Sequence, residues 1–326
     1  MNLLTNGTPQ VPDRPPHTWA GLPVHDFKGN VTEIFERIPI FERRPFRLDG
    51  SSDASLENRF HDLIVRCPDK SQPKEIPVAL VSKRYGLLQH RAVAKEAVKS
   101  TEAAGIDPGS LVCSLSLTEH GERMALFLQL PIKYEFDPGD GYPMTLRLCC
   151  YNSVDGHSGL VAHIGWYRFV CSNGMFVGVT KSRFRRVHDH RAEIGEIGLA
   201  FTEGVQLAAG EKSLFQKWIN RPVSEERLRG WVDGRLTKAW GVKAATRAFH
   251  IAEDGHDVAL ADPFEKAPAS RRKIKQGNPV PGALFPARNA YGISQVLSWL
   301  ARERHEVEDQ LQRTREIPVL MRRLLN

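Results

Sequence analysis

The spacing of hydrophobic and polar positions changes near residue 190. Before it, short runs rich in branched residues, such as HDLIVRC (61–67) and IPVALVS (76–82), end at turn signals, a pattern typical of strands joined by short connections. After it, apolar residues recur at intervals of three and four, which indicates helices. Together the two patterns predict an α+β fold: an antiparallel sheet core with a packing helix, followed by a helical C-terminal part.

One helix is predicted inside the strand-rich region. In the segment HRAVAKEAVKSTEAAG (90–105), Val93, Ala94 and Ala97 fall on one face, and Gly105 stands where a helix C-cap is expected. An amphipathic helix buries its apolar face, so we expect this one to pack against the sheet. The strands around it turn at His120-Gly121 and at later Asp-Gly and Asn-Gly pairs, which predicts an antiparallel meander.

Proline and glycine mark the expected boundaries between parts of the chain. Four prolines between residues 9 and 16 indicate an extended arm, within which residues 34–46 alternate like an early strand. A charged stretch rich in Pro and Gly after residue 254 indicates a linker. The predicted organisation is an extended N-terminal arm (1–57), an antiparallel sheet core domain (58–190), a helical extension (191–254), a linker or loop (255–288) and C-terminal helices (289–326) that break near Pro318.

The composition adds a basic bias. The 326 residues include 45 Lys and Arg against 38 Asp and Glu, a net charge of +7, which favours an acidic partner such as nucleic acid.

No window approaches the roughly 18 apolar residues of a membrane span, and the N-terminus lacks a signal-peptide pattern, so we expect a cytoplasmic protein that does not contact the membrane. The five cysteines lack a framework spacing, which favours free thiols.

Basic residues cluster in three segments. In KSRFRRVHDHR (181–191), strand alternation would place two arginines on one face as a track for phosphates, or would make a charged edge strand that resists pairing. SKRYG (82–86) sets an aromatic ring among cations, and SRRKIKQG (270–277) lies in the expected loop; either could bind phosphate or be ordinary solvated surface. The predicted nucleic-acid-binding residues are Lys83, Arg84, Tyr85, Arg183, Arg185, Arg186, Arg271, Arg272, Lys273 and Lys275.

The segment CCYNSVDGHSGLVAHIGWYRFVCSNGM (149–175) holds residues that could carry chemistry. Cys149 and Cys150 are adjacent on a predicted strand and point to opposite faces, so they cannot easily share one metal ion. We therefore predict no metal and no cofactor. A catalytic role would need Cys171 as a thiol activated by a nearby base, or His188 and His190 as a pair that chelates a metal ion. The simpler interpretation is that Cys171 is a buried cysteine beside a tight turn. The catalytic candidates are Cys171, His188, His190 and Asp155.

Two polar turns flank one strand of this segment. Ordinary turn chemistry accounts for both, because Asx side chains cap backbone donors and glycine adopts positive φ without cost. The chain has no P-loop, no G-x-G-x-x-G after a strand, no H-E-x-x-H and no G-x-S-x-G, so several common enzyme classes have no motif here. The motif residues of the two turns are Asn152, Asp155 and Gly156 in the first, and Cys171, Asn173 and Gly174 in the second.

These turns resemble a family of phage and plasmid proteins, domain of unknown function 932. The resemblance is carried by N-S-x-D-G-x-S at 152–158, V-C-S-N-G at 170–174 and VALVSKRYGLLQHRAV at 78–93, and it covers about residues 75–300. His157 departs from the family pattern, since it separates Gly156 from Ser158. The resemblance implies a mobile-element setting, near genes of DNA replication, repair or anti-defence, and it supplies no catalytic mechanism. A likeness to strand-annealing recombinases rests on fold class alone.

Three hypotheses for function remain open at this point. The first is a nucleic-acid-binding protein of a phage, plasmid or integrated element, which binds or anneals single strands in DNA replication or recombination. Its expected partner is DNA ahead of RNA, and self-association is left open. The second is an enzyme that processes nucleic acid or nucleotides with the catalytic candidates above. The third is a protein–protein inhibitor or anti-defence module whose basic face meets an acidic protein.

Overall fold

A computed structural model of the chain describes residues 19, 22–47, 57–168, 175–176, 183–186, 196–304 and 307–326. Within these residues the main sheet has eight strands, and every pairing in it is antiparallel. The predicted α+β fold, with an antiparallel sheet and a helical C-terminal part, is confirmed. The central path is β1 (Val24–Gly29), β5 (Val112–Thr118), β6 (Arg123–Gln129), β8 (Met144–Ser153), β9 (Leu160–Arg168) and β10 (Met175–Phe176), with β7 (Glu135–Phe136) on β8 and β11 (Arg183–Arg186) on β9.

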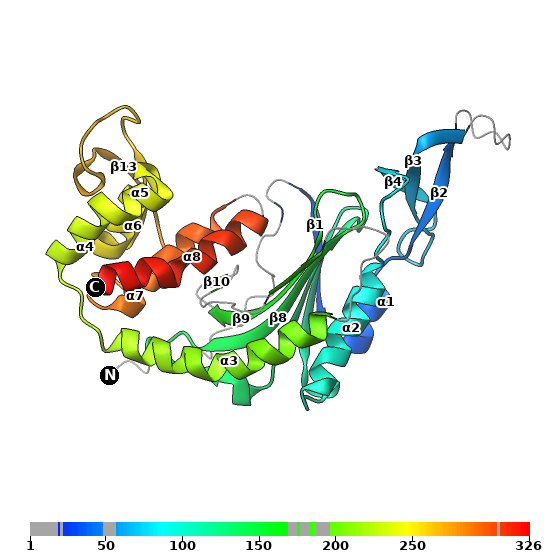
Figure 1. Cartoon of the computed structure of the whole chain (residues 1–326), viewed down its shortest axis with the longest axis horizontal. Helices are drawn as coiled ribbons and strands as arrows, with labels where there is room; N and C mark the ends of the chain where they lie inside the picture. The colour runs from blue at the N-terminus through cyan, green and yellow to red at the C-terminus, as the bar shows by residue number, and fades with distance from the viewer. Residues whose placement is uncertain are drawn as a thin grey trace, which may run out of the picture.

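Both faces of the main sheet are covered, so β8 and β9 are buried along their whole length. Alternation sends Leu126 and Leu128 of β6 into the larger core cluster, and Ala125 and Phe127 into a smaller cluster on the other face. Helix α2 (His90–Ala103) and the long helix α3 (Glu196–Ile219) cover the first face, as Figure 1 shows. The predicted packing helix is thereby confirmed as α2, which buries Val93, Ala94 and Ala97.

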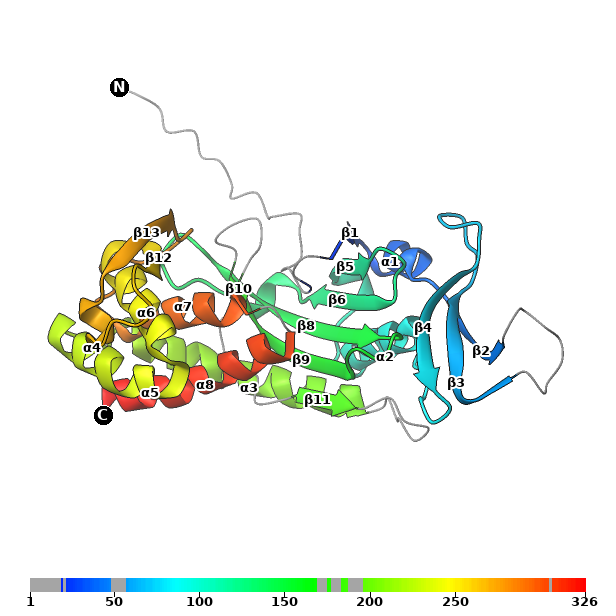
Figure 2. The same cartoon turned by 90° about the horizontal axis from the view of Figure 1, so that it is seen from above.

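A second, smaller sheet projects from one end of the main sheet (Figures 1 and 2). In the described part of the chain it has three antiparallel strands in the order β2-β3-β4. One of its faces packs Phe41, Ile64 and Val81 against Val154 of the β8–β9 turn, which joins the two sheets. Its strands are β2 (Phe41–Arg47), β3 (Glu57–Arg66) and β4 (Ile76–Ser82).

The N-terminal region differs from the predicted extended arm. Strand β1 pairs with β5 in the main sheet, and the expected strand at 34–46 is instead helix α1 (Val31–Arg37) followed by β2. A capping box starts the helix, because Asn30 accepts from the Glu33 backbone at 3.0 Å and Glu33 accepts from the Asn30 backbone at 2.8 Å. Ile34 and Ile38, one helical turn apart, are both buried. The alternation was therefore misleading for residues 34–37, which are helical, while residues 41–46 do form a strand, in β2.

The helical part lies at the other end of the main sheet (Figure 2). The region predicted as a linker or loop, 255–288, contains a two-stranded antiparallel hairpin whose strands are joined by a loop at 261–273. Pro318 lies inside the last helix, whose buried Ile317, Leu320 and Met321 outweigh the one backbone bond that proline removes. The elements are α4 (Glu225–Trp231), η5 (Val232–Leu236), α5 (Thr237–Trp240), α6 (Val242–Asp254), β12 (His256–Leu260), η6 (Ala269–Arg271), β13 (Ile274–Pro279), α7 (Ala290–Arg302) and α8 (Val307–Leu325).

Helix α8 contributes to the second face of the main sheet. Its Leu311 packs in one cluster with Trp19 and with Phe127 and Tyr151 of the strands. The helical part is therefore joined to the sheet by a shared core. Among the helices of the described residues, none combines the length and apolar character needed to cross a membrane.

Candidate nucleic-acid interface

The positive charge of the protein is concentrated in its last third. Residues 221–326 hold 19 Lys and Arg against 13 Asp and Glu, so they carry +6 of the net charge of +7. The first 220 residues are nearly balanced, with 26 basic and 25 acidic residues. An anionic ligand would therefore be attracted to the helical C-terminal part.

Three cations of this region line an open cleft of about 560 Å³. They are Arg235 in η5, Lys238 in α5 and Arg323 in α8, and the other lining residues are Ala239 and Asn326. All three are exposed, and none forms an ion pair with another described residue. No Asp or Glu side chain lines the cleft in the described part of the chain. The cleft therefore offers three positive charges that no Asp or Glu side chain of the described residues neutralises.

A π-helical turn brings Arg235 to this cleft. The helix that begins in α4 continues through η5 into α5, and in η5 one turn is widened by an extra residue. The Thr237 hydroxyl donates to the Val232 carbonyl at 2.8 Å, which satisfies a backbone group near the widened turn. Turns of this kind are frequent at functional sites. The same turn supplies Asp233, which binds the neighbouring hairpin.

Two aspartates fix the β12–β13 hairpin to the helices. The Asp233 carboxylate accepts from both the backbone N–H and the hydroxyl of Ser270, each at 2.7 Å. At the base of the hairpin, Asp257 pairs with Arg247 of α6 and accepts from Trp299 Nε1 of α7 at 3.2 Å. Burial alone would raise the pKa of Asp257, but the hydrogen bonds and charge of Arg247 outweigh it and lower that pKa. The hairpin is thus held at both ends.

The basic cluster predicted at 270–277 lies in and beside this hairpin. Arg271, Lys273 and Lys275 are exposed, and their side chains make no ion pair within the described residues. Arg272 has a different role, since its guanidinium donates to the Ala267 carbonyl at 3.1 Å and holds the loop in place. The geometry therefore leaves three of the four predicted cations available to a ligand. We call these three residues, with Arg235, Lys238 and Arg323, the C-terminal basic surface.

Sequence reasoning missed the three cleft cations. Arg235, Lys238 and Arg323 stand alone in helical segments rather than in a cluster, so nothing in their local sequence separates them from solvated surface charges. The one available signal is Gly230 and Gly234, because glycine is unfavourable inside a helix and marks the turn as unusual.

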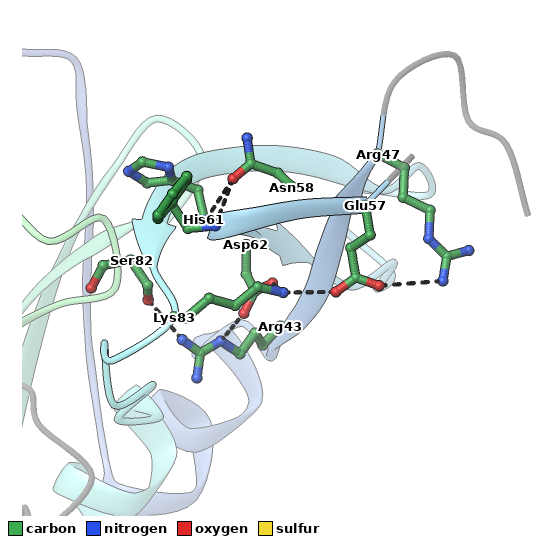
Figure 3. A network of polar contacts seen from close by, with 9 residues as sticks. Arg43, Arg47, Glu57, Asn58, His61, Asp62, Ser82 and Lys83 are labelled. Carbon is green, nitrogen blue, oxygen red and sulfur yellow. Dashed lines mark hydrogen bonds and ion pairs between the residues drawn. The ribbon is translucent and has the colours of Figure 1, made fainter. Parts of the chain in front are cut away.

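The predicted site around Lys83 is occupied by the protein's own charges. Figure 3 shows the Lys83 ammonium between Glu57, at 2.8 Å, and the buried Asp62, at 2.5 Å. The hydrogen bonds to Asp62 and Glu57 raise the pKa of Lys83. Arg43 also binds Asp62, at 2.8 Å, and Arg47 lies 3.8 Å from Glu57. This network stabilises the small sheet, and the geometry does not support Lys83 as a phosphate ligand.

The two residues that follow Lys83, Arg84 and Tyr85, differ in whether a ligand could reach their side chains. Tyr85 packs in the core cluster of the small sheet, its hydroxyl donates to the Ser153 carbonyl at 3.1 Å, and burial raises its pKa. A ring held in this way is not presented to a base, which contradicts the predicted stacking role. Arg84 is exposed and forms no ion pair within the described part of the chain. Of this predicted group, Arg84 alone keeps a geometry open to phosphate.

The arginine-rich strand predicted at 181–191 forms in part as β11. Its backbone pairs with β9, with Arg183 opposite His163, Arg185 opposite Val161 and Arg186 opposite Leu160. For these four residues the structure describes the backbone only. His188 and His190 lie outside the described residues. The phosphate-track hypothesis for this strand therefore stays a prediction.

The first polar turn is built into the core. Asn152 is buried, and its amide donates to the Leu88 carbonyl at 3.0 Å and to His90 Nδ1 at 2.8 Å. His90 Nε2 in turn donates to the Gly121 carbonyl at 2.9 Å. Asn152 thus connects the end of β8 to the entry of α2 and to the β5–β6 turn. This is a structural clamp between three separate segments.

Asp155 and Gly156 complete the same turn. The Asp155 carboxylate pairs with Arg123 of β6 at 2.7 Å and accepts from the His157 backbone at 2.9 Å, so it holds the turn closed. Gly156 has φ of 76°, a conformation that side chains disfavour. These contacts give Asp155 a structural role and provide no nucleophile or base beside it. The predicted turn chemistry agrees with the geometry.

The remaining candidates for chemistry have little support in the described residues. Cys171, Asn173 and Gly174 lie outside them. Burial raises the pKa of the Cys149 and Cys150 thiols, to about 12 for Cys150, which makes both poor nucleophiles. The described part of the chain contains no group of three or more His, Cys, Asp or Glu side chains placed to hold a metal ion.

Comparison with known protein families finds one family model that matches the chain. The model of the domain of unknown function DUF932 matches residues 77–285, which is more than half of the chain. The chain belongs to the DUF932 family. The match begins in β4 and ends before α7, so it includes the 152–156 turn, η5 and the hairpin, while Arg323 lies beyond it. No curated protein and no solved structure matches the chain.

Proposed function

We propose that this DUF932 protein binds nucleic acid through its C-terminal basic surface. The observation that supports the proposal is the cleft, where Arg235, Lys238 and Arg323 converge and no Asp or Glu side chain of the described residues is among the lining residues. A phosphate bound there would be attracted electrostatically by each of the three cations. None of the cations would first have to leave an ion pair with another described residue. The exposed cations of the hairpin add positive charge to the same C-terminal part, which the hydrogen bonds between Ser270 and Asp233 of η5 hold to the helices.

The proposal includes the setting that the family resemblance implies. DNA replication or recombination of a phage, plasmid or integrated element would present DNA as the ligand, in the cytoplasm. Four of the five cysteines lie in the described residues, and all four are free thiols, which agrees with a reducing compartment. No catalytic step is proposed, since the contacts of Asp155 are structural.

The test is a salt titration of binding by fluorescence anisotropy. Each phosphate neutralised contributes about 0.9 to the slope of log affinity against log salt for duplex DNA and about 0.7 for a single strand. The triple variant Arg235→Gln, Lys238→Gln, Arg323→Gln should therefore lower the slope by about two to three units and weaken binding most at low salt.

A matched control removes the same charge elsewhere. Lys70, Lys74 and Lys95 are exposed, form no ion pair within the described residues and lie far from the helical part in sequence. The triple variant Lys70→Gln, Lys74→Gln, Lys95→Gln changes the net charge equally and should keep the wild-type slope within about half a unit. Equal losses in the two triple variants would mean that only net charge matters, and would contradict a defined site in the cleft.

A further inference from the structure

The most exposed large hydrophobic side chain of the described residues lies in the hairpin loop. Phe264 is 90% exposed, more than Ile132 at 79% or Phe60 at 75%. A single exposed apolar residue is ordinary on a protein surface and by itself means nothing. The position of Phe264, within residues 261–273 between β12 and β13, is what distinguishes it.

The loop that carries Phe264 is held by its own hydrogen bonds. Asp262 accepts from the Phe264 backbone through its carboxylate at 2.8 Å, and Glu265 accepts from the Lys273 backbone at 2.9 Å. The Arg272 guanidinium donates to the Pro263 and Ala267 carbonyls, which flank Phe264 in the sequence. Since Ser270 is also bound to Asp233 of η5, the loop backbone is held at a position where the Phe264 side chain is exposed to solvent.

Exposed cations surround this ring along the sequence. Residues 261–277 contain five Lys and Arg against two Asp and Glu, and Lys266, Arg271, Lys273 and Lys275 are all exposed. An exposed aromatic ring among cations is an arrangement that binds unpaired bases, because the ring stacks on a base while the cations neutralise the flanking phosphates. In a duplex the base faces are already stacked and are not accessible to a ring at the surface.

We propose that the hairpin loop is a single-strand subsite in which an unpaired base stacks on Phe264. This inference rests on the proposed function, and it names the ligand class as single-stranded nucleic acid. The ring would not select one base, because every base has a π face. The cations of the hairpin would hold the strand, and Phe264 would distinguish a strand with bases from a bare phosphate backbone.

The experiment compares three probes of equal length: labelled oligo-dT, the same backbone with abasic sites, and a mixed-sequence duplex. Wild type should bind oligo-dT more tightly than the abasic strand. Phe264→Ala should weaken binding to oligo-dT by roughly 5- to 150-fold and leave binding to the abasic strand unchanged. Phe264→Tyr should restore the preference, since a tyrosine ring also stacks. Ile132→Ala, which removes another highly exposed apolar side chain, from the short helix η4 (Ile132–Tyr134), should match wild type on every probe.

The outcomes separate this inference from the proposed function. If wild type binds the oligo-dT and abasic strands equally with a steep salt slope, the basic surface stands and the stacking subsite is overturned. A loss in Phe264→Ala that is equal for all three probes also overturns it, because the ring would then act as a wedge or as a structural residue. Absence of binding by wild type to every probe overturns the proposed function itself.

Discussion

Asn152→Ala tests whether the family-motif turn is structural. The Asn152 side chain is 1% exposed, and its amide is the donor for two buried acceptors, the Leu88 carbonyl and His90 Nδ1. His90 Nε2 is already committed to the Gly121 carbonyl, so the ring cannot turn to find another donor without losing that bond. The substitution therefore leaves both acceptors buried and without the partner they have in the folded protein.

The expected cost follows from these contacts. A buried acceptor left without a donor costs about 1–3 kcal/mol, so two of them would cost about 2–6 kcal/mol. The Asn152 carbonyl oxygen is buried without a hydrogen-bond partner among the described residues, and its removal recovers part of the loss. We expect the free energy of unfolding to fall by about 2–4 kcal/mol, which a domain of typical stability survives.

Urea unfolding followed by far-UV circular dichroism measures this difference, provided the slope with denaturant is unchanged. Asn220→Ala is the control, because Asn220 makes a single exposed bond to the Gln216 carbonyl and its loss should cost under about 0.5 kcal/mol. Folded Asn152→Ala should bind nucleic acid as wild type does. A variant of unchanged stability with impaired binding would refute the structural assignment.

Three further predictions use other parts of the molecule. Iodoacetamide at pH 8 should alkylate the partly exposed Cys67 well before the buried Cys150, whose pKa burial raises to about 12; equal rates by peptide mass mapping would contradict this. Asp257 has a folded-state pKa lowered below its ordinary value of 3.8, so its stabilising pair with Arg247 is present above about pH 4 and is lost as the pH falls further. The stability difference between wild type and Asp257→Asn should accordingly shrink below pH 4, and a constant difference would contradict the pairing. Asp233→Ala should speed hydrogen exchange of the hairpin-loop amides by about tenfold or more, and unchanged exchange would show that the loop is held by other contacts.

Local patterns predicted the elements whose stability is local. Residues 90–103 form a helix because Val93 and Ala97 repeat at the helical spacing, and that spacing is visible in the sequence itself. The strands around the 152–156 turn followed from branched residues and turn signals. The hairpin at 255–288 was missed because its pairing partners lie on both sides of a long charged loop, and composition alone does not distinguish such a loop from a linker.

Strand β1 illustrates the same limit over a longer distance. Residues 24–29 enter the main sheet by pairing with β5, far away in the chain, and no property of the six residues alone determines that partner. The segment 34–46 alternates in a way that fits a strand, but the capping box at Asn30 and the buried faces of Ile34 and Ile38 favour a helix over its first part. The burial of Ile34 and Ile38 in the core therefore favoured the helix over the strand for this part of the segment.

The sequence by itself determined the α+β class, the packing helix α2 and the family-motif turn at 152–156, because hydrophobic spacing and turn residues report interactions among near neighbours. Only the tertiary structure decided which charges are available to a ligand. Lys83 looks like an exposed cation in the sequence, yet Glu57 and Asp62 neutralise it. Arg235 and Arg323, in contrast, come from distant helices to one cleft that no Asp or Glu side chain of the described residues lines. Ion pairing depends on which side chains fold together, and that long-range arrangement is not encoded in the local pattern of any one segment.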